Sequence, residues 1–230
     1  MAIDESSGYR TKTEMAFQTI RSLLLSGELS PGENMTYRQL SERLQMSQTP
    51  VREAVRRLEA EGLLRSQPHK GVSATDLRDL SIEEAQDLYL VRMLLEREAA
   101  RLAASRIDAE QCDAMQQARL AMEEAAASDD PGRLRQLHGQ WHFHVHRASG
   151  SPYLASLCAS AWNRFPWEAV WVVPGRLERS MAQHREIEEA IFNGDGDAAA
   201  RLMEEHVETG RRTVLKHLSS HRLMLEGGPK

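Results

Sequence analysis

Residues 40–64 read LSERLQMSQTPVREAVRRLEAEGLL, and this stretch decides the fold of the 230-residue chain. It predicts two short helices joined by a tight polar turn. In the second helix, Val51, Val55 and Leu58 recur at i, i+4 and i+7, which gives the helix one buried stripe. Ser47 suits its N-cap, and Pro50 falls in the first turn, where a missing N–H costs nothing. We therefore expect a sharply started helix whose polar N-terminal residues face outward.

The outward side of this second helix is rich in hydrogen-bond donors, as a helix that reads base edges requires. A helix-turn-helix places the first turn of its second helix in the major groove of DNA. We expect Gln48, Thr49 and Arg52 to contact base edges. Arg38 and Arg56 are expected to make phosphate or mixed contacts. The alternative, from the charge pattern alone, is an ordinary helical hairpin whose arginines form a solvated face.

The segments on either side of this stretch complete a winged helix. Upstream, apolar residues at helical spacing from Phe17 to Leu25 precede a loop at SGELSPGENM, residues 26–35. Downstream, two strand candidates over 63–66 and 72–74 surround the sequence QPHKG, in which Gly71 suits a tight turn. The order helix, helix, helix, hairpin predicts a winged helix-turn-helix domain over residues 1–76.

Together, IRSLLLSGELSPGENM (20–35), residues 40–64 and HKGVSA (69–74) resemble the DNA-binding domain of the GntR family of bacterial transcription regulators. The resemblance implies that Lys70 and Gly71, at the tip of the wing, approach the minor groove or a phosphate; a solvated turn is the alternative. Members of the family commonly carry arginine where this chain has Gln48. Because glutamine pairs with adenine and arginine with guanine, we expect the same docking but a different base preference.

The charge of the chain is unevenly divided. The formal net charge is −5, yet residues 10–72 carry 10 Lys and Arg against 7 Asp and Glu, whereas residues 77–230 carry 19 against 24. A phosphate backbone would repel the acidic part, so we expect residues 77–230 to form a separate domain.

Neither a membrane segment nor a secretion signal is expected. The chain has no run of about 18 apolar residues, and its first residues lack the apolar stretch of a signal peptide. Its two cysteines, Cys112 and Cys158, are far apart and lack metal-type spacing. A reduced cytoplasmic protein without a membrane partner is the expectation.

Residues 77–230 show helical periodicity almost throughout. Ser81 opens a capping box before a helix that runs to about Ser105. The expected core side of this helix comprises Leu88, Val91, Leu95, Ala99 and Leu102. Further helices are expected from Asp108, from Pro131 and from Pro152, and then over 177–193 and 197–218. The chain is thus expected to be mainly α, with a winged helix-turn-helix domain followed by an all-α antiparallel bundle of about six helices.

Four histidines lie in the single stretch HGQWHFHVH, residues 138–146. His138 and His142, at i and i+4, share one helix face. His184 and His206 lie on the last two helices, about equally far from the Gly-Asp-Gly turn that joins them, so they can come level with each other. Four imidazoles from three helices would form a site for a divalent ion, zinc first, with nickel or manganese as alternatives. A solvated or mutually paired histidine face is the other interpretation.

A second resemblance covers the rest of the chain. LYLVRMLLEREAARLAA (88–104), WHFHVHRASGSPYL (141–154) and HREIEEAIFNGDGDAAARLMEEH (184–206) are similar to the FCD effector domain of the FadR subfamily of GntR regulators. In its metal-binding members the ligands are an Asp and a His four residues apart and a His on each of two later helices. The resemblance therefore implies His142, His184 and His206 as ligands, while the Asp position falls on His138.

This departure at His138 changes the charge of the expected site. A divalent metal keeps a net charge of +2 among four neutral imidazoles, against +1 when one ligand is a carboxylate. We expect His138 to remain a ligand and the more positive metal to bind an anionic effector more strongly. The alternative is that position 138 has left the coordination shell and the metal is weak or absent.

The resemblance also implies a small carboxylate or sugar acid as effector beside the metal. Arg92, in the family's R-x-x-L-E pattern, is expected to clamp a carboxylate, or instead to pair with Glu96. Trp171, which clusters with Trp162 and Trp167, is expected to wall the effector pocket, with core packing as the alternative.

The expected function is a ligand-responsive transcription regulator rather than an enzyme. Repression is the commoner mode in the resembled family. A homodimer would bind a pseudo-palindromic double-stranded DNA operator. The rival interpretation is a metal-dependent hydrolase that uses the histidine site, but no carboxylate or serine is placed by motif as base or nucleophile.

Overall fold

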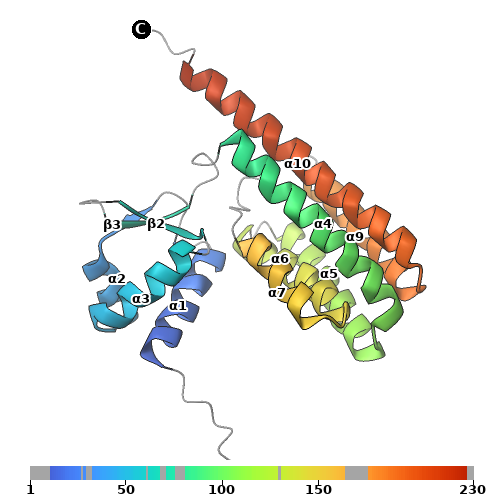
Figure 1. The fold of residues 1–230 in the computed structure, drawn as a ribbon, viewed down its shortest axis with the longest axis horizontal. Coiled ribbons are helices and arrows are strands. Elements are labelled where there is room, and N and C mark those ends of the chain that lie inside the picture. The colour runs from blue at the N-terminus through green and yellow to red at the C-terminus, as the bar shows by residue number, and fades with distance from the viewer. Residues whose placement is uncertain are drawn as a thin grey trace, which may run out of the picture. The chain divides into compact units, whose positions relative to one another are not determined.

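A computed structural model of the chain describes residues 11–226, except 27, 30–32, 61, 68–70, 76–80, 129–130 and 164–175. The chain divides into two compact units, Met1–Thr75 and Asp76–Lys230 (Figure 1). Most of the described residues are helical, and strands occur only in the first unit. Within these ranges, no helix combines the length and the apolarity that a membrane crossing requires.

The first unit is the winged helix that the sequence predicts. Its helices are α1 (Lys12–Ser26), α2 (Tyr37–Leu44) and α3 (Gln48–Ala60), and its strands are β1 (Asn34–Met35), β2 (Leu64–Gln67) and β3 (Gly71–Ala74). The strands form an antiparallel sheet in the order β1-β3-β2, with Leu64 opposite Ala74 and Met35 opposite Val72. The strand β1 falls where we expected only a loop, because a two-residue strand has no periodicity to detect.

The core of this unit is the apolar stripe predicted on α3. Val51, Val55 and Leu58 are fully buried and pack with Phe17 and Ile20 of α1. A capping box starts α2: Thr36 Oγ1 accepts a hydrogen bond from the backbone N–H of Gln39, and the Gln39 side chain accepts one from Thr36 N–H. These local signals orient α3 with its apolar side inward and its polar side to solvent.

Gly71 is required by the close approach of β3 to β1. Its φ of +91° lies in the left-handed region, and a Cβ at this position would lie 2.4 Å from the carbonyl oxygen of Met35. Any side chain would therefore collide with main chain rather than with a movable side chain. Glycine at this position allows the wing to pair with the short strand before α2.

The second unit is an antiparallel bundle of helices (Figure 1). Its members are α4 (Ile82–Arg106), α5 (Ala109–Ala127), α6 (Pro131–Ala148), α7 (Pro152–Asn163), α9 (Arg176–Phe192) and α10 (Gly196–Glu226). The capping boxes predicted at Ser81 and Asp108 are both formed. The last helix runs beyond the expected end at residue 218, as far as Glu226, and the hydroxyls of Ser219 and Ser220 donate hydrogen bonds to carbonyls one turn back.

The buried face of α4 differs from the one we expected. Val91 is 46% exposed, whereas Tyr89, Arg92, Glu96 and the alanines of the last turns are buried. Ala99 is buried and Leu88 packs against the core as expected, so the prediction was wrong at Val91; the residues buried beyond the expected set are a charged pair, a tyrosine and further alanines. The large side chains left on the outer side of α4 are Leu90, Val91 and Leu94.

Candidate functional sites

The residues expected to read DNA lie on the exposed side of the helix-turn-helix. Gln48, Thr49, Arg52 and Arg56 are all exposed on α3, and Arg38 is exposed in the first turn of α2. Gly71 begins β3, whereas Lys70 lies outside the described residues. The base-edge candidates therefore share the N-terminal half of one solvent-facing helix.

Arg52 is positioned by two neighbours. Its Nη2 donates to the side-chain oxygen of Gln48 at 3.3 Å, and its guanidinium carbon lies 4.3 Å from the ring centroid of Tyr37. The Tyr37 hydroxyl in turn shares a hydrogen bond of 3.0 Å with Ser66 Oγ of β2. Tyr37 thus links α2, α3 and the wing. Local spacing in the sequence does not predict this role, because the contact joins residues far apart in the chain.

Arg38 and Arg56 make only solvent-exposed ion pairs. Arg38 pairs with Glu42 at 2.8 Å and Arg56 with Glu53 at 2.9 Å, and more than half of each of these side chains is exposed. Exposed pairs of this kind contribute about 0–1 kcal/mol. A phosphate group can therefore displace the glutamates at little cost.

In the bundle, the four predicted metal ligands come together. His138 and His142 on α6, His184 on α9 and His206 on α10 each offer one ring nitrogen, and these four atoms lie within 4.8 Å of one another. All four side chains are buried, with exposed fractions of 3% or less. The short Gly-Asp-Gly connection does bring His184 and His206 level, with ring centroids 4.7 Å apart.

Burial makes these imidazoles neutral. It lowers the pKa of His142 to about 4, although the nearby Glu96 carboxylate acts in the opposite direction. Burial also lowers the pKa of His138, His184 and His206 well below the usual value, and the neighbouring imidazoles add to this effect. Neutral imidazoles carry the lone pairs that a metal ion requires, so at neutral pH the cluster is in its ligating protonation state.

A carboxylate orients the central histidine of the cluster. His142 Nδ1 lies 2.6 Å from Glu96 Oε2, and Arg92 Nε donates to Glu96 Oε1 at 2.7 Å. Burial alone would raise the pKa of the Glu96 carboxyl, but Arg92 and His142 together hold it well below its usual range. Because an ionised carboxylate only accepts hydrogen bonds, Nδ1 of His142 carries the proton and Nε2 keeps its lone pair. This carboxylate–histidine arrangement is typical of metal sites.

The residues fit a divalent cation. Among the described side chains, His142 Nε2 and both ring nitrogens of His184 are buried without a hydrogen-bond partner. Each buried polar group left in this state costs about 1–3 kcal/mol. A divalent ion bound by these nitrogens would offset that cost, and zinc is commonly held by imidazole nitrogens in four-coordinate sites. His206 Nδ1 faces the Gln183 side-chain oxygen at 3.2 Å, which orients a second ring of the set.

Glu96 is a site residue that the sequence indicated only as a partner for Arg92. Its Oε2 also lies 3.4 Å from Nε2 of His146, and Glu96, His142 and His146 form a second group whose possible ligand atoms lie within 4.8 Å of one another. The available signal was the spacing of Arg92 and Glu96, one turn apart on a helix face that also carries the buried Tyr89. Two opposite charges at i and i+4 on a buried face indicate a structural ion pair.

Arg92 forms the ion pair with Glu96 that the sequence indicated as the alternative to an effector clamp. Besides its ion pair with Glu96, its guanidinium carbon lies 4.6 Å from the ring centroid of Trp162, which is itself buried. Trp167 and Trp171 lie outside the described residues. Arg92 therefore supports the cluster through Glu96, and its expected role as an effector clamp stays a prediction.

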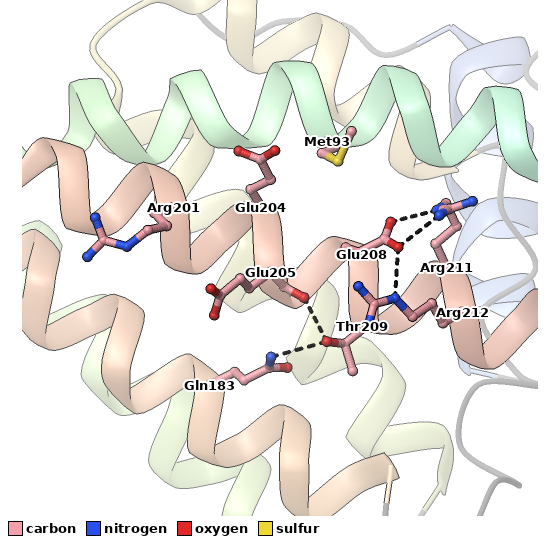
Figure 2. Close-up of a pocket in the computed structure, with 9 residues that line it drawn as sticks. All are labelled: Met93, Gln183, Arg201, Glu204, Glu205, Glu208, Thr209, Arg211 and Arg212. Carbon is pink, nitrogen blue, oxygen red and sulfur yellow. Dashed lines mark hydrogen bonds and ion pairs between the residues drawn. The ribbon is translucent and has the colours of Figure 1, made fainter.

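An open groove runs along α10 beside this site (Figure 2). It has a volume of about 790 Å³ and is lined by Met93, Gln183, Arg201, Glu204, Glu205, Glu208, Thr209, Arg211 and Arg212. Gln183 connects the groove to the cluster, because its amide nitrogen donates to Thr209 Oγ1 while its oxygen faces His206. Hydrogen bonds from Arg211 and Arg212 lower the pKa of Glu208 to about 2. With three arginines against three glutamates, the formal charges of the lining side chains sum to zero.

Known proteins match the chain over both units. Residues 12–73 match the family described as bacterial regulatory proteins, gntR family, and residues 87–209 match the FCD domain.

A probable D-xylose utilization operon transcriptional repressor from Paenarthrobacter nicotinovorans is 30% identical, with 89% of this chain and 91% of that protein covered. The Uxu operon transcriptional regulator of Escherichia coli strain K12 is 26% identical, covering 90% and 88%. The solved structure of E. coli McbR/YncC has the same fold, with a TM-score of 0.78 at 19% identity over 90% of this chain and 98% of that one.

Proposed function

Since this chain belongs to the GntR family of bacterial regulatory proteins and carries an FCD domain, we propose that its bundle binds a divalent metal ion and senses a small organic acid or sugar acid beside it. The chain is a DNA-binding transcriptional regulator. Its relatives are transcriptional regulators and not enzymes, so the hydrolase interpretation is set aside. We propose repression as its mode, in keeping with the relative that is named a probable repressor.

The convergence of four buried histidines from three helices carries the metal proposal. His138, His142, His184 and His206 would hold the ion, zinc first and nickel or manganese as alternatives. The bound ion would supply a positive charge that attracts an anionic effector. With four neutral imidazoles as ligands, that charge would stay at +2, which is the consequence of histidine at position 138.

Glu96 would act as a positioning residue for this site. By accepting the Nδ1 proton of His142, it fixes the tautomer and the ring orientation that leave Nε2 for the ion. Arg92 keeps Glu96 ionised and in place. The interactions from Arg92 through Glu96 to His142 join α4 to α6. A change at the ligands would therefore reach α4, which makes the most extensive helix contact of the bundle with α10.

For DNA, we propose that Gln48, Thr49 and Arg52 contact base edges in the major groove, and that Arg38, Arg56, Lys70 and Gly71 contact the backbone or the minor groove. A homodimer on a pseudo-palindromic operator would use both copies of α3. The apolar side chains of Leu90, Val91 and Leu94, exposed on α4, support association with a second copy. Light scattering on wild-type protein and on Leu94→Glu tests this assembly.

Metal analysis tests the central proposal. Wild-type protein saturated with zinc and then desalted should retain about one ion per chain. His142→Ala and His184→Ala should lose it, since each removes a ligand. His144→Ala is the matched control, because His144 lies on the same helix, is half-buried and is outside the cluster. Wild-type protein that retains no metal would overturn the proposal.

A further inference from the structure

One face of α9 carries three buried polar residues in a column. Arg176, Ser180 and His184 are spaced at i, i+4 and i+8, which places them on the same side of the helix. Their exposed fractions are 6%, 0% and 0%. Arg176 Nε and Nη1, Ser180 Oγ and both nitrogens of His184 have no hydrogen-bond partner within the described part of the chain. The large majority of buried side-chain polar atoms in proteins have a hydrogen-bond partner, so such a column needs an explanation.

The proposed metal accounts for His184 but not for Arg176 and Ser180. Arg176 differs from the other buried arginine of this region. Arg92 is neutralised by Glu96 at 2.7 Å, whereas Arg176 makes no ion pair with a described residue. Burial lowers the pKa of Arg176, which reflects the cost of holding this charge away from water. A buried charge without a counter-ion typically costs several kcal/mol.

The described residues around Arg176 leave space for its guanidinium but supply no negative charge. A Cβ at Gly210 of α10 would lie 3.3 Å from Arg176 Nη2 and 3.3 Å from the hydroxyl oxygen of Tyr89, so the absent side chain leaves room for both groups. Burial raises the pKa of Tyr89 to about 12, so this phenol is neutral and does not balance the charge. Arg176 is also the first residue of α9, where the helix N-terminus adds positive potential.

We propose that Arg176 and Ser180 form the anion-binding end of the effector site and take the carboxylate of an acid whose other end lies at the histidine cluster. The guanidinium and the hydroxyl would donate to the carboxylate oxygens and gain the partners that they lack in the protein alone. This inference rests on the proposed function, which it deepens by naming the residues that select the effector's charge.

The spacing of the column also restricts the class of acid. Arg176 and His184 are eight residues apart, which is about 12 Å along the helix axis, with Ser180 about 6 Å from each. A ligand that reaches both ends must carry a second oxygen function remote from the carboxylate. Sugar acids meet this requirement because they carry hydroxyl groups far from the carboxylate, whereas acetate does not.

Thermal unfolding of the full chain tests the inference. Zinc-loaded protein would be titrated with sodium D-gluconate, with sodium acetate as the one-ended acid, D-sorbitol as the neutral analogue and sodium chloride at matched ionic strength. We expect gluconate to raise the melting temperature of the wild type more than acetate does, and sorbitol and chloride to leave it unchanged. Arg176→Met should melt higher than the wild type without anion, because it removes an unpaired buried charge, and should bind gluconate about tenfold or more weakly.

Arg179→Met is the matched control, because it removes an exposed arginine from the same helix. It should respond as the wild type does, and Ser180→Ala should respond more weakly. A wild type that gluconate does not stabilise, or an Arg176→Met variant that keeps the wild-type response, would overturn the inference. Zinc is measured in the same samples: a gluconate response that survives removal of zinc but is lost in Arg176→Met supports the inference even where the metal proposal fails.

Discussion

The two units use polar residues in opposite ways. The winged helix keeps a purely apolar stripe inside α3 and puts its donors in water, where a DNA duplex can reach them. The bundle buries its polar groups: four histidines, the Arg92–Glu96 pair and the column on α9 all lie in its interior. A surface site can be changed without affecting the fold, whereas an interior site is part of the stability of its domain.

Replacing a carboxylate inside the bundle should have the largest effect. Glu96→Ala leaves Arg92 as an uncompensated buried charge and removes the partner of His142 Nδ1, so we expect a loss of about 3–5 kcal/mol in the free energy of unfolding. All four tryptophans of the sequence belong to the second unit, Asp76–Lys230, so denaturant titrations followed by tryptophan fluorescence report on this unit. Glu98→Ala, at a more exposed pair on the same helix, should cost about 1 kcal/mol or less. If both variants lost the same free energy of unfolding, the buried Arg92–Glu96 pair would contribute no more to stability than the exposed pair.

A substitution on the DNA-facing helix should instead change recognition and leave stability intact. Gln48→Arg should shift preference toward guanine at one position of each half-site, by about 1–3 kcal/mol of discrimination. Selection of bound sites from a random DNA library, for wild type and variant, measures this shift. Unchanged site preference would remove Gln48 from the residues that read bases.

Acid should destabilise the metal-free bundle. The pKa of His142 is lowered to about 4 in the folded protein, against about 6.5 when unfolded, so the unfolded chain binds more protons between these values. Stability should therefore fall as the pH is lowered from 7 to 5, by about 2 kcal/mol from His142 alone. The winged helix has no buried histidine among its described residues and should not share this dependence. Denaturant titrations in the presence of a chelator, followed by tryptophan fluorescence at each pH, measure this change. A denaturation midpoint that does not depend on pH would contradict the prediction.

The smallest effect is expected at Tyr37, whose ring lies under the DNA-facing side chain of Arg52. Tyr37→Leu removes the ring under Arg52, and operator affinity should fall by about 0.5–1 kcal/mol. Tyr37→Phe keeps the ring and loses only the hydrogen bond to Ser66, so it serves as the control in a fluorescence-anisotropy titration. If the two variants bind equally, the stacking of Arg52 contributes nothing.

The contrast between the units also decides what could be predicted from the sequence. In the winged helix, hydrophobic periodicity and capping residues define the elements, since the polar side is the outer side. In the bundle the same periodicity found the helices but placed Val91 of α4 in the core and did not place Arg92 and Glu96 there, because charged residues are not expected inside. The histidine spacing indicated the cluster. Contacts between distant segments, such as that of Glu96 with His142, are not encoded in local spacing.

Gly71 has a consequence for how this regulator can evolve. Because a Cβ there would meet the main chain of β1, no substitution can add a side chain at this position without rebuilding the wing. Any contact that Gly71 makes with DNA is limited to its backbone and is the same for every sequence. Gly71 is therefore a constant part of the docking, and a new operator preference in descendants of this protein must arise at other positions, such as the exposed side chains of α3.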